Sequence, residues 1–245
     1  MDVKGKAVIV TGATSGIGME TARLLSNQGA RVALVARTRE KLDELAAEIK
    51  GSAAFPADMS MENEARRIIK EAFYHFGSVD ILVNDAGLGY DSSIETIDMM
   101  LFRKILQLNV IGPLAAMQEV FPIMRMQKEG GIIVNVSSAT SLMYLPEMGA
   151  YSSTKRVLNA LTLTAKEELK GEKVRFSLVY PYITRTNFEK NTLQNKGQKP
   201  KEFDYDALAK NGRPLADTPQ YAAQKILEAI TTEKPEVFAH DWLKE

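Results

Sequence analysis

The 245-residue sequence contains no cysteine and only two histidines, His75 and His240, and its 31 basic and 31 acidic residues balance. The absence of cysteine excludes disulfides, thiolate zinc sites and cysteine nucleophiles. The two histidines lie far apart and neither belongs to a metal-ligand motif, so we expect no metal site, and neither a zinc enzyme nor a Ser-His-Asp hydrolase. The balanced charge argues against a nucleic-acid partner.

Targeting signals and long apolar runs are also missing. The chain opens with charged residues and leads directly into a strand-like segment, without a cationic start, an apolar stretch and a cleavage site in series. No apolar run reaches the length of about 18 residues that indicates a membrane-spanning helix. We therefore expect a cytoplasmic protein with no membrane partner. Hydrophobic residues make up 45% of the chain, which is typical of globular proteins.

Short apolar segments rich in β-branched residues alternate with longer helical patterns. The expected strands cover residues 7–10, 31–35, 81–83, 132–136, 174–179 and 236–239. The expected helices cover residues 18–27, 39–50, 61–76, 96–127 (interrupted at Gly112 and Pro113) and 151–170. Nearly continuous apolar strands indicate a sheet that is covered on both faces. The alternation predicts an α/β fold of the Rossmann type, with a doubly wound parallel sheet of about seven strands.

The chain shows no repeat, linker or low-complexity segment, so we expect residues 1–245 to form a single domain. The composition shifts once, in the polar, lysine-rich stretch of residues 187–217. This stretch is either a solvated surface excursion or a lid on the substrate side.

A glycine-rich turn follows the first expected strand and precedes a helix. It reads TGATSGIG over residues 11–18. Glycines allow tight turning and a close approach of the backbone to a pyrophosphate, and the helix N-terminus adds free N–H groups and a positive dipole end. The residues of this turn that are predicted to bind a dinucleotide are Gly12, Thr14, Ser15, Gly16, Ile17 and Gly18.

The end of the second expected strand indicates which dinucleotide is bound. About 20 residues past the last glycine, an NAD site carries an acid for the ribose 2′-hydroxyl, but here Ala36 is followed by Arg37. A carboxylate would repel a 2′-phosphate, whereas a guanidinium can hold one through a charged fork. Arg37 is therefore our candidate for recognising NADP, with Arg39 or Ser15 as an additional contact. The alternative is an ordinary surface arginine at a strand end.

Four polar residues complete a known pattern. Tyr151 and Lys155 lie four residues apart, so a helix places them on one face, and Ser138 ends a buried strand thirteen residues before Tyr151. Asn109 lies in the segment LNVIG. Together with the turn of pattern TGx3GxG, these motifs resemble the compact single-domain branch of the short-chain dehydrogenase/reductase family over most of the chain.

The resemblance implies an oxidoreductase, a carbonyl reductase or alcohol dehydrogenase, that transfers a hydride between NADP(H) and its substrate with Tyr151 as general acid and base. A neighbouring Lys155 ammonium is expected to lower the pKa of the phenol from about 10 towards the operating pH, where general acid catalysis works best. Ser138 can hold the substrate oxygen. The resemblance further implies that Lys155 contacts the nicotinamide ribose and that the backbone of Asn109 anchors a water relay.

Further cofactor residues are implied by the resemblance. Asp58 is similar to the acid that hydrogen-bonds the adenine amino group in the family, and it is also placed to cap the next helix. The segment NDAG, residues 84–87, resembles the family's NNAG with Asp85 in place of the second Asn. An ionised Asp only accepts hydrogen bonds, so either a partner has changed or the site is altered. The matching positions of NDAG are Asn84, Ala86 and Gly87.

After the next expected strand, the segment PYITRT, residues 181–186, lies where the family has Pro-Gly followed by a Thr five residues after the Pro. Pro181 and Thr186 match this pattern. The resemblance implies that Thr186 contacts the carboxamide of the nicotinamide, together with the backbone of Ile183 or Thr184.

Tyr182 replaces a family glycine, and we expect its side chain to intrude near the nicotinamide or to narrow the substrate entrance. The apolar segment of residues 142–148 lies where the family lines its substrate pocket, which favours an apolar carbonyl or alcohol, although packing or a subunit contact explains it equally well. The alternative function is a catalytically silent dinucleotide-binding regulator or scaffold, which only Asp85 and Tyr182 support. Apolar residues on two long helices predict a homodimer or homotetramer; they are Leu101, Ile105, Leu108, Leu158, Leu161 and Leu163.

Overall fold

The computed structural model describes residues 1–197 and 216–244. Seven strands form one sheet in the order β3-β2-β1-β4-β6-β7-β9, and every pair is parallel. The strands are β1 (Ala7–Thr11), β2 (Arg31–Ala36), β3 (Ser52–Pro56), β4 (Ile81–Asn84), β6 (Gly131–Val136), β7 (Val174–Tyr180) and β9 (Glu236–Phe238). The strand order reverses between β1 and β4, where a doubly wound sheet opens a crevice. The predicted fold class is confirmed.

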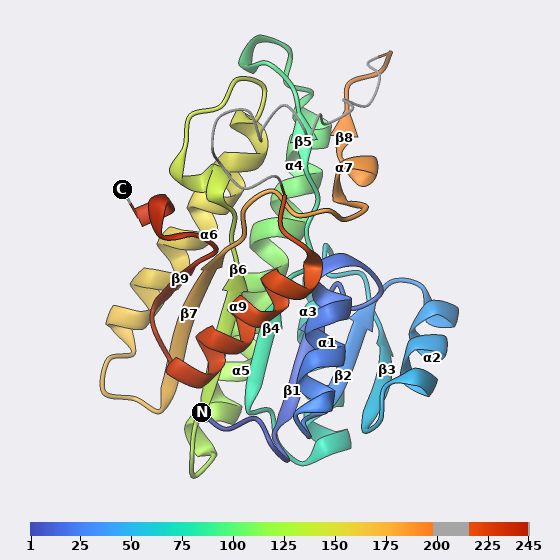
Figure 1. The fold of residues 1–245 in the computed structure, drawn as a ribbon, viewed down its shortest axis with the longest axis vertical. Coiled ribbons are helices and arrows are strands. Elements are labelled where there is room, and N and C mark those ends of the chain that lie inside the picture. Colours follow the sequence, from blue (N-terminus) through green and yellow to red (C-terminus); the bar gives the residue numbers. More distant parts are fainter. Residues whose placement is uncertain (198–215, 245) are drawn as a thin grey trace.

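Helices cover both faces of the sheet (Figure 1). On one face lie α1 (Gly16–Asn27), α2 (Arg39–Glu48) and α9 (Pro219–Thr232), and on the other lie α3 (Glu62–Phe76), α5 (Gly112–Met126) and α6 (Gly149–Glu168). Successive residues of β1 divide between the two cores, since Val8 and Val10 pack on the first face and Ile9 packs on the second. Within the described ranges, no helix is long and apolar enough to cross a membrane.

Two elements were not expected from the sequence. The edge strand β3 reads SAAFP and has little β-branched character, and it pairs only with β2. The helix α9 carried a readable start signal, because Thr218 accepts a hydrogen bond from the Tyr221 N–H at 3.1 Å and Pro219 occupies the first turn.

The long helix expected over residues 96–127 is interrupted earlier than predicted. It consists of α4 (Met99–Leu106), a π-helical turn (Gln107–Ile111) and then α5, which begins at Gly112. Gly112 is required for packing, since a Cβ there would lie 1.9 Å from the Met59 carbonyl oxygen. Of the apolar residues expected at a subunit interface, Ile105 and Leu158 are buried inside the chain and serve its own packing.

A small second sheet lies above the carboxyl ends of the main strands (Figure 1). It pairs β5 (Tyr90–Asp91) with β8 (Leu193–Gln194), which follows the short helix α7 (Phe188–Asn191). The hydroxyl of Tyr90 donates to the Asn195 side chain and accepts the Asp98 N–H. The first part of the stretch of residues 187–217 therefore lies against β5, through β8. Residues 198–215 of the stretch lie outside the described residues.

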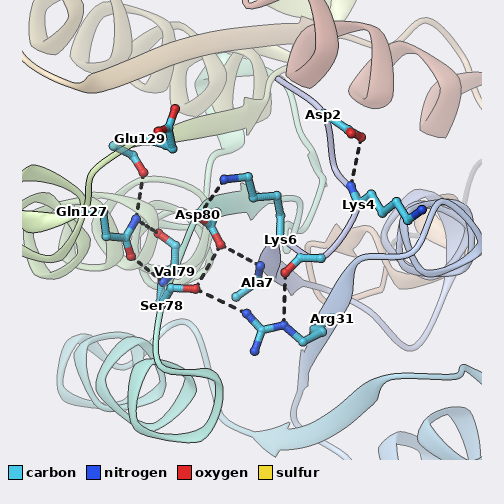
Figure 2. A network of polar contacts seen from close by, with 12 residues as sticks. Asp2, Lys4, Lys6, Ala7, Arg31, Ser78, Val79, Asp80, Gln127 and Glu129 are labelled. Carbon is cyan, nitrogen blue, oxygen red and sulfur yellow. Dashed lines mark hydrogen bonds and ion pairs between the residues drawn. The ribbon is translucent and has the colours of Figure 1, made fainter.

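A polar network closes the opposite, amino-terminal edge of the sheet (Figure 2). The Asp80 carboxylate accepts the Ala7 N–H at 2.8 Å, the Ser78 hydroxyl at 3.0 Å and the Lys6 ammonium at 3.4 Å. The Arg31 guanidinium donates to backbone carbonyls at the same edge. Because Asp80 is only 7% exposed, water has little access to these donors and cannot take the place of the carboxylate as their acceptor.

We expect Asp80→Ala to lower the free energy of unfolding by about 1–3 kcal/mol, because it leaves the Ala7 N–H without its buried acceptor. Denaturant titration measures the change. Asp43→Ala is the control, since Asp43 forms an exposed i,i+4 pair with Arg39 and its loss costs about 0.5 kcal/mol or less. Equal effects of the two substitutions would contradict a role for Asp80 in holding the strands.

Candidate active site

The site lies at the carboxyl-terminal edge of the sheet, where the turns after parallel strands meet. The glycine-rich turn follows β1, residues 84–87 follow β4, Ser138 follows β6 and Pro181 follows β7. Tyr151 and Lys155 are added by α6, and Asn109 by the π-helical turn. Residues far apart in the sequence are therefore brought together by the strand order.

The glycine-rich turn has a conformation that only glycine adopts readily. Gly12 and Gly16 have φ of +73° and +55°, and a Cβ on Gly18 would lie 2.6 Å from the Gly12 carbonyl oxygen. Ser15 is the N-cap of α1 but its side chain caps no N–H, and the first turn holds no acid. These features fit the pyrophosphate of a dinucleotide. Thr186 lies over the turn, 3.2 Å from where a Cβ on Gly16 would be.

Hydrogen bonds tie the turn after β4 to its neighbours. The hydroxyl of Thr11, the first residue of the glycine motif, accepts the N–H groups of Asp85 at 3.0 Å and Ala86 at 3.1 Å. The Asn84 amide donates to the Asn135 side chain at 2.8 Å, which links β4 to β6. Thr11 was not among the predicted site residues, although its position as the first residue of the glycine motif could have indicated its role.

Asp85 supports the glycine-rich turn. Its Oδ2 atom lies 2.8 Å and 3.3 Å from where Cβ atoms on Gly18 and Gly12 would be, and the nearby Gly18 N–H lowers the pKa of its carboxyl group. A pure acceptor therefore faces a backbone donor. Burial raises the pKa of Asp85 to about 7, against the opposing effects of the Lys155 charge and the Gly18 N–H.

Tyr151, Ser138 and Lys155 converge beside this turn. Tyr151 and Lys155 are 6% and 4% exposed, and the Ser138 side chain lies near enough to the phenol to lower its pKa. The Lys155 Nζ atom donates to the Val136 carbonyl oxygen at 2.8 Å and lies 6.0 Å from the centre of the Tyr151 ring. The three predicted side chains thus meet in one place.

The pKa of Tyr151 moves in the opposite direction from the expected one. Burial raises it above the ordinary value, the Ser138 side chain lowers it and the charge of Asp85 raises it. Burial lowers the pKa of Lys155 to about 8, against the opposing effect of Asp85. The Lys155 charge does not offset the effect of burial on the phenol.

Asn109 fixes the position of these elements through its side chain. Its Oδ1 accepts the Leu88 N–H at 2.9 Å, and its Nδ2 donates to the Leu88 carbonyl at 2.9 Å and to the Thr154 hydroxyl at 3.0 Å. Asn109 is fully buried. The π-helical turn, the turn after β4 and α6 are joined at this one amide, and Thr154 is a contributor that the sequence did not single out.

Phe188 is a second residue that the sequence did not single out. Its ring centre lies 5.4 Å from that of Tyr151, with the planes tilted by 57°. Its helix also packs closely on Gly89, where a Cβ would lie 3.0 Å from the Phe188 ring. Phe188 lies 37 positions from Tyr151 in the sequence, so only the fold reveals that it forms an apolar wall beside the phenol.

Arg37 and Asp58 line one cavity of about 320 Å³, together with Pro56, Ala57 and Glu64. Arg37 is exposed and has no hydrogen bond or ion pair to the other described residues. Asp58 does not cap α3, whose N-cap is Met61. Its carboxylate accepts the Ser60 N–H at 2.9 Å and the Ser60 hydroxyl at 2.7 Å, because the chain turns once more before the helix starts.

Tyr182 lies in a buried cluster with carboxyl-terminal residues. Its ring makes edge contacts with His240 at 5.8 Å and Trp242 at 5.1 Å between ring centres. His240 in turn contacts the Asp217 carboxylate at 3.1 Å. The same cluster includes Ala139 from the turn after β6, so the effect of the Tyr182 side chain on the nicotinamide region or the substrate entrance stays a prediction.

Comparisons with known proteins agree with this geometry. Residues 6–197 match the family model described as short chain dehydrogenase. An uncharacterised oxidoreductase of Staphylococcus saprophyticus is 32% identical over 94% of this chain and 91% of its own length. The dehydrogenase/reductase SDR family member 7B of Mus musculus is 29% identical over 98% of this chain and 75% of its own length.

Two solved structures have the same fold. A 3-ketoacyl-(acyl-carrier-protein) reductase from Brucella melitensis, complexed with NADH, superposes with a TM-score of 0.82 and 27% identity over 93% of this chain and 91% of that one. A short chain dehydrogenase/reductase from Burkholderia phymatum, in complex with NAD, superposes with a TM-score of 0.86 and 24% identity over 100% of this chain and 92% of that one.

We expect Tyr151 to stay protonated up to at least pH of about 10 in the protein without dinucleotide, because burial raises its pKa. Ultraviolet absorbance of tyrosinate is titrated in the wild type and in Tyr151→Phe, and the difference isolates this residue from the other seven of the eight tyrosines. A difference signal with a midpoint below that of free tyrosine would show that Lys155 overcomes the effect of burial.

Proposed function

Because the chain belongs to the short-chain dehydrogenase/reductase family, whose members are oxidoreductases that bind a nicotinamide dinucleotide, we propose that it is an NADP(H)-dependent carbonyl reductase or alcohol dehydrogenase. The observation that carries the proposal is the convergence of Tyr151, Ser138 and Lys155 beside the glycine-rich turn. This arrangement supplies a proton donor, a hydrogen-bond partner for the substrate oxygen and a buried cation in one place.

The bound dinucleotide supplies or accepts the hydride at its nicotinamide ring. On the substrate side, a carbonyl that receives a hydride develops negative charge on its oxygen. Tyr151 then donates its phenolic proton to that oxygen as the general acid. Ser138 orients the oxygen, and the Lys155 ammonium stabilises the phenolate that the transfer leaves behind.

Several residues of the chain fit the remaining parts of the dinucleotide. The N–H groups at the start of α1 would hold the pyrophosphate, and Asp58 would contact the adenine. Thr186 and the backbone of Ile183 or Thr184 would contact the carboxamide. The first of these assignments is supported by the uncapped helix start, and the second by the cavity that Asp58 lines with Arg37. The Asn109 backbone is proposed to anchor a water relay to Lys155.

Arg37 supports the choice of NADP over NAD. It is an exposed guanidinium at the end of β2, free of other bonds to the described residues and lining the cavity at the adenosine end. A guanidinium fork binds a phosphate in two places. The Brucella melitensis reductase is complexed with NADH, so the proposal depends on this arginine and not on the relatives.

An apolar substrate is supported by the side chains around Tyr151. Phe188 packs on the phenol ring, and Leu142, Tyr144 and Leu145 in the segment before α6 are exposed. The proposed substrate is therefore a small carbonyl or alcohol with an apolar body. We also propose that copies of the chain assemble as a homodimer or homotetramer.

Tyr151→Phe should reduce turnover of a ketone by about 10²–10⁴-fold at saturating NADPH, because it removes the general acid, while NADPH binding and the fold persist. Lys155→Met should be at least as damaging and should also weaken NADPH binding. Ser138→Ala should impair turnover without affecting binding. Steady-state kinetics and fluorescence titration measure both quantities.

Tyr74→Phe is the matched control, since Tyr74 is 82% exposed on α3 and loses the same hydroxyl. The mechanism fails if Tyr151→Phe keeps more than about a tenth of wild-type turnover while a deuteride isotope effect shows that hydride transfer limits the rate. Bound NADPH with no turnover of ketones, aldehydes or thioester-linked ketones would favour the silent regulator instead.

Arg37→Ala should weaken NADPH binding by about 1.5–3 kcal/mol, which is roughly 10- to 150-fold, and leave NADH binding nearly unchanged. Fluorescence titration with both dinucleotides measures the difference. Lys41→Ala removes a nearby exposed cation from α2 and controls for general charge effects. Wild-type protein that binds NADH as tightly as NADPH would show that the proposed specificity is wrong.

A further inference from the structure

One half-buried acid, Asp85, lies between the glycine-rich turn and the Tyr151–Lys155 pair and has no part in the proposed chemistry. Asp85 touches the glycine-rich turn on one side, where its Oδ2 atom lies 2.8 Å from a Cβ position on Gly18. On the other side its charge acts on Lys155 and Tyr151. The residue also departs from the family motif, which places an amide there.

We propose that Asp85 makes dinucleotide binding proton-linked: its carboxylate takes up a proton from solvent when the pyrophosphate docks on the glycine-rich turn that it supports. The inference rests on the dinucleotide site proposed above. It concerns the pyrophosphate, which NADH and NADPH share, and is therefore independent of the choice between them.

The surroundings of Asp85 hold its two protonation states in near balance. Burial favours the neutral carboxyl, whereas the Gly18 N–H and the Lys155 ammonium favour the carboxylate, and together they place the pKa at about 7. Within the described residues, Lys155 and Tyr151 are the titratable groups that interact with it. A small additional negative charge is then sufficient to change its protonation near neutral pH.

A docked pyrophosphate supplies that charge. It binds at the N-terminus of α1, the helix whose Gly18 N–H already contacts the carboxylate. Anionic oxygens at the same turn repel an ionised Asp85, so the pKa of Asp85 rises on binding. Below pH of about 7 the carboxyl is already neutral in the free protein and affinity is constant, whereas above it Kd increases by up to about tenfold per pH unit.

Asp85→Asn tests the proposal because it keeps the shape and a carbonyl oxygen that can accept the Gly18 N–H, but cannot ionise. Isothermal titration calorimetry of NADPH and of NADH, in buffers of different ionisation enthalpy, counts the protons taken up. Near pH 8 the wild type should take up more protons than Asp85→Asn, by up to one per dinucleotide. Asp85→Asn should bind about tenfold more tightly there and equally at pH 6.

Subtracting the two proteins removes the contribution of the 2′-phosphate, which also titrates near neutral pH. The pKa of Lys155 itself depends on Asp85, so its contribution is separated by the infrared measurement below, which follows carboxyl groups alone. Asp80→Asn is the matched control: it changes a buried acid at the opposite edge of the sheet and should keep the wild-type proton count. Equal proton counts and parallel Kd curves for the wild type and Asp85→Asn would overturn the inference and leave the proposed function intact. No binding of either dinucleotide would overturn both.

A measurement on the wild type keeps the test independent of whether the variant folds. Infrared difference spectra, recorded as NADPH is added between pH 7 and 8, should show a protonated-carboxyl band growing at the expense of a carboxylate band. A spectrum with no such change at saturating NADPH would overturn the proposal.

Discussion

Lys155 carries a positive charge into the interior of the protein, and the catalytic end of the site is arranged around it. Only 4% of its surface is exposed, so its ammonium needs polar partners within the protein. The Val136 carbonyl at the end of β6 provides one hydrogen bond at 2.8 Å, and the charge of Asp85 after β4 provides a countercharge. Two strand ends are thereby linked to α6, and Tyr151 is held one helical turn away.

The rigidity of this arrangement comes from amide and hydroxyl groups that bridge elements. The Asn109 side chain bonds both backbone groups of Leu88 and the Thr154 hydroxyl. The Thr11 hydroxyl accepts two N–H groups of the turn after β4. Both residues are buried, so their hydrogen bonds lack competition from water. These bonds hold Tyr151 and Lys155 in place, and the segment that carries Phe188 packs against the Tyr151 ring.

Local motifs predicted most of the fold and of the site, and they failed where a contact crosses elements. The glycine turn and the Tyr151–Lys155 spacing were readable because each depends on its own few residues. The packing of Tyr182 could not be predicted, because the sequence does not show that His240 and Trp242 lie against its ring. The pKa of Tyr151 was misjudged for the same reason, since burial is set by packing from several elements.

The sequence by itself determined the alternation of strands and helices, the glycine-rich turn and the spacing of Tyr151 and Lys155, because apolar periodicity, glycine conformation and helical spacing are local properties. Only the tertiary structure decided which groups surround the Asp85 carboxylate. The carboxylate meets the Gly18 N–H and the charge of Lys155, residues that lie 67 positions before it and 70 after it. The balance between burial and charge that sets its protonation exists only once the parallel strands bring those turns to one edge.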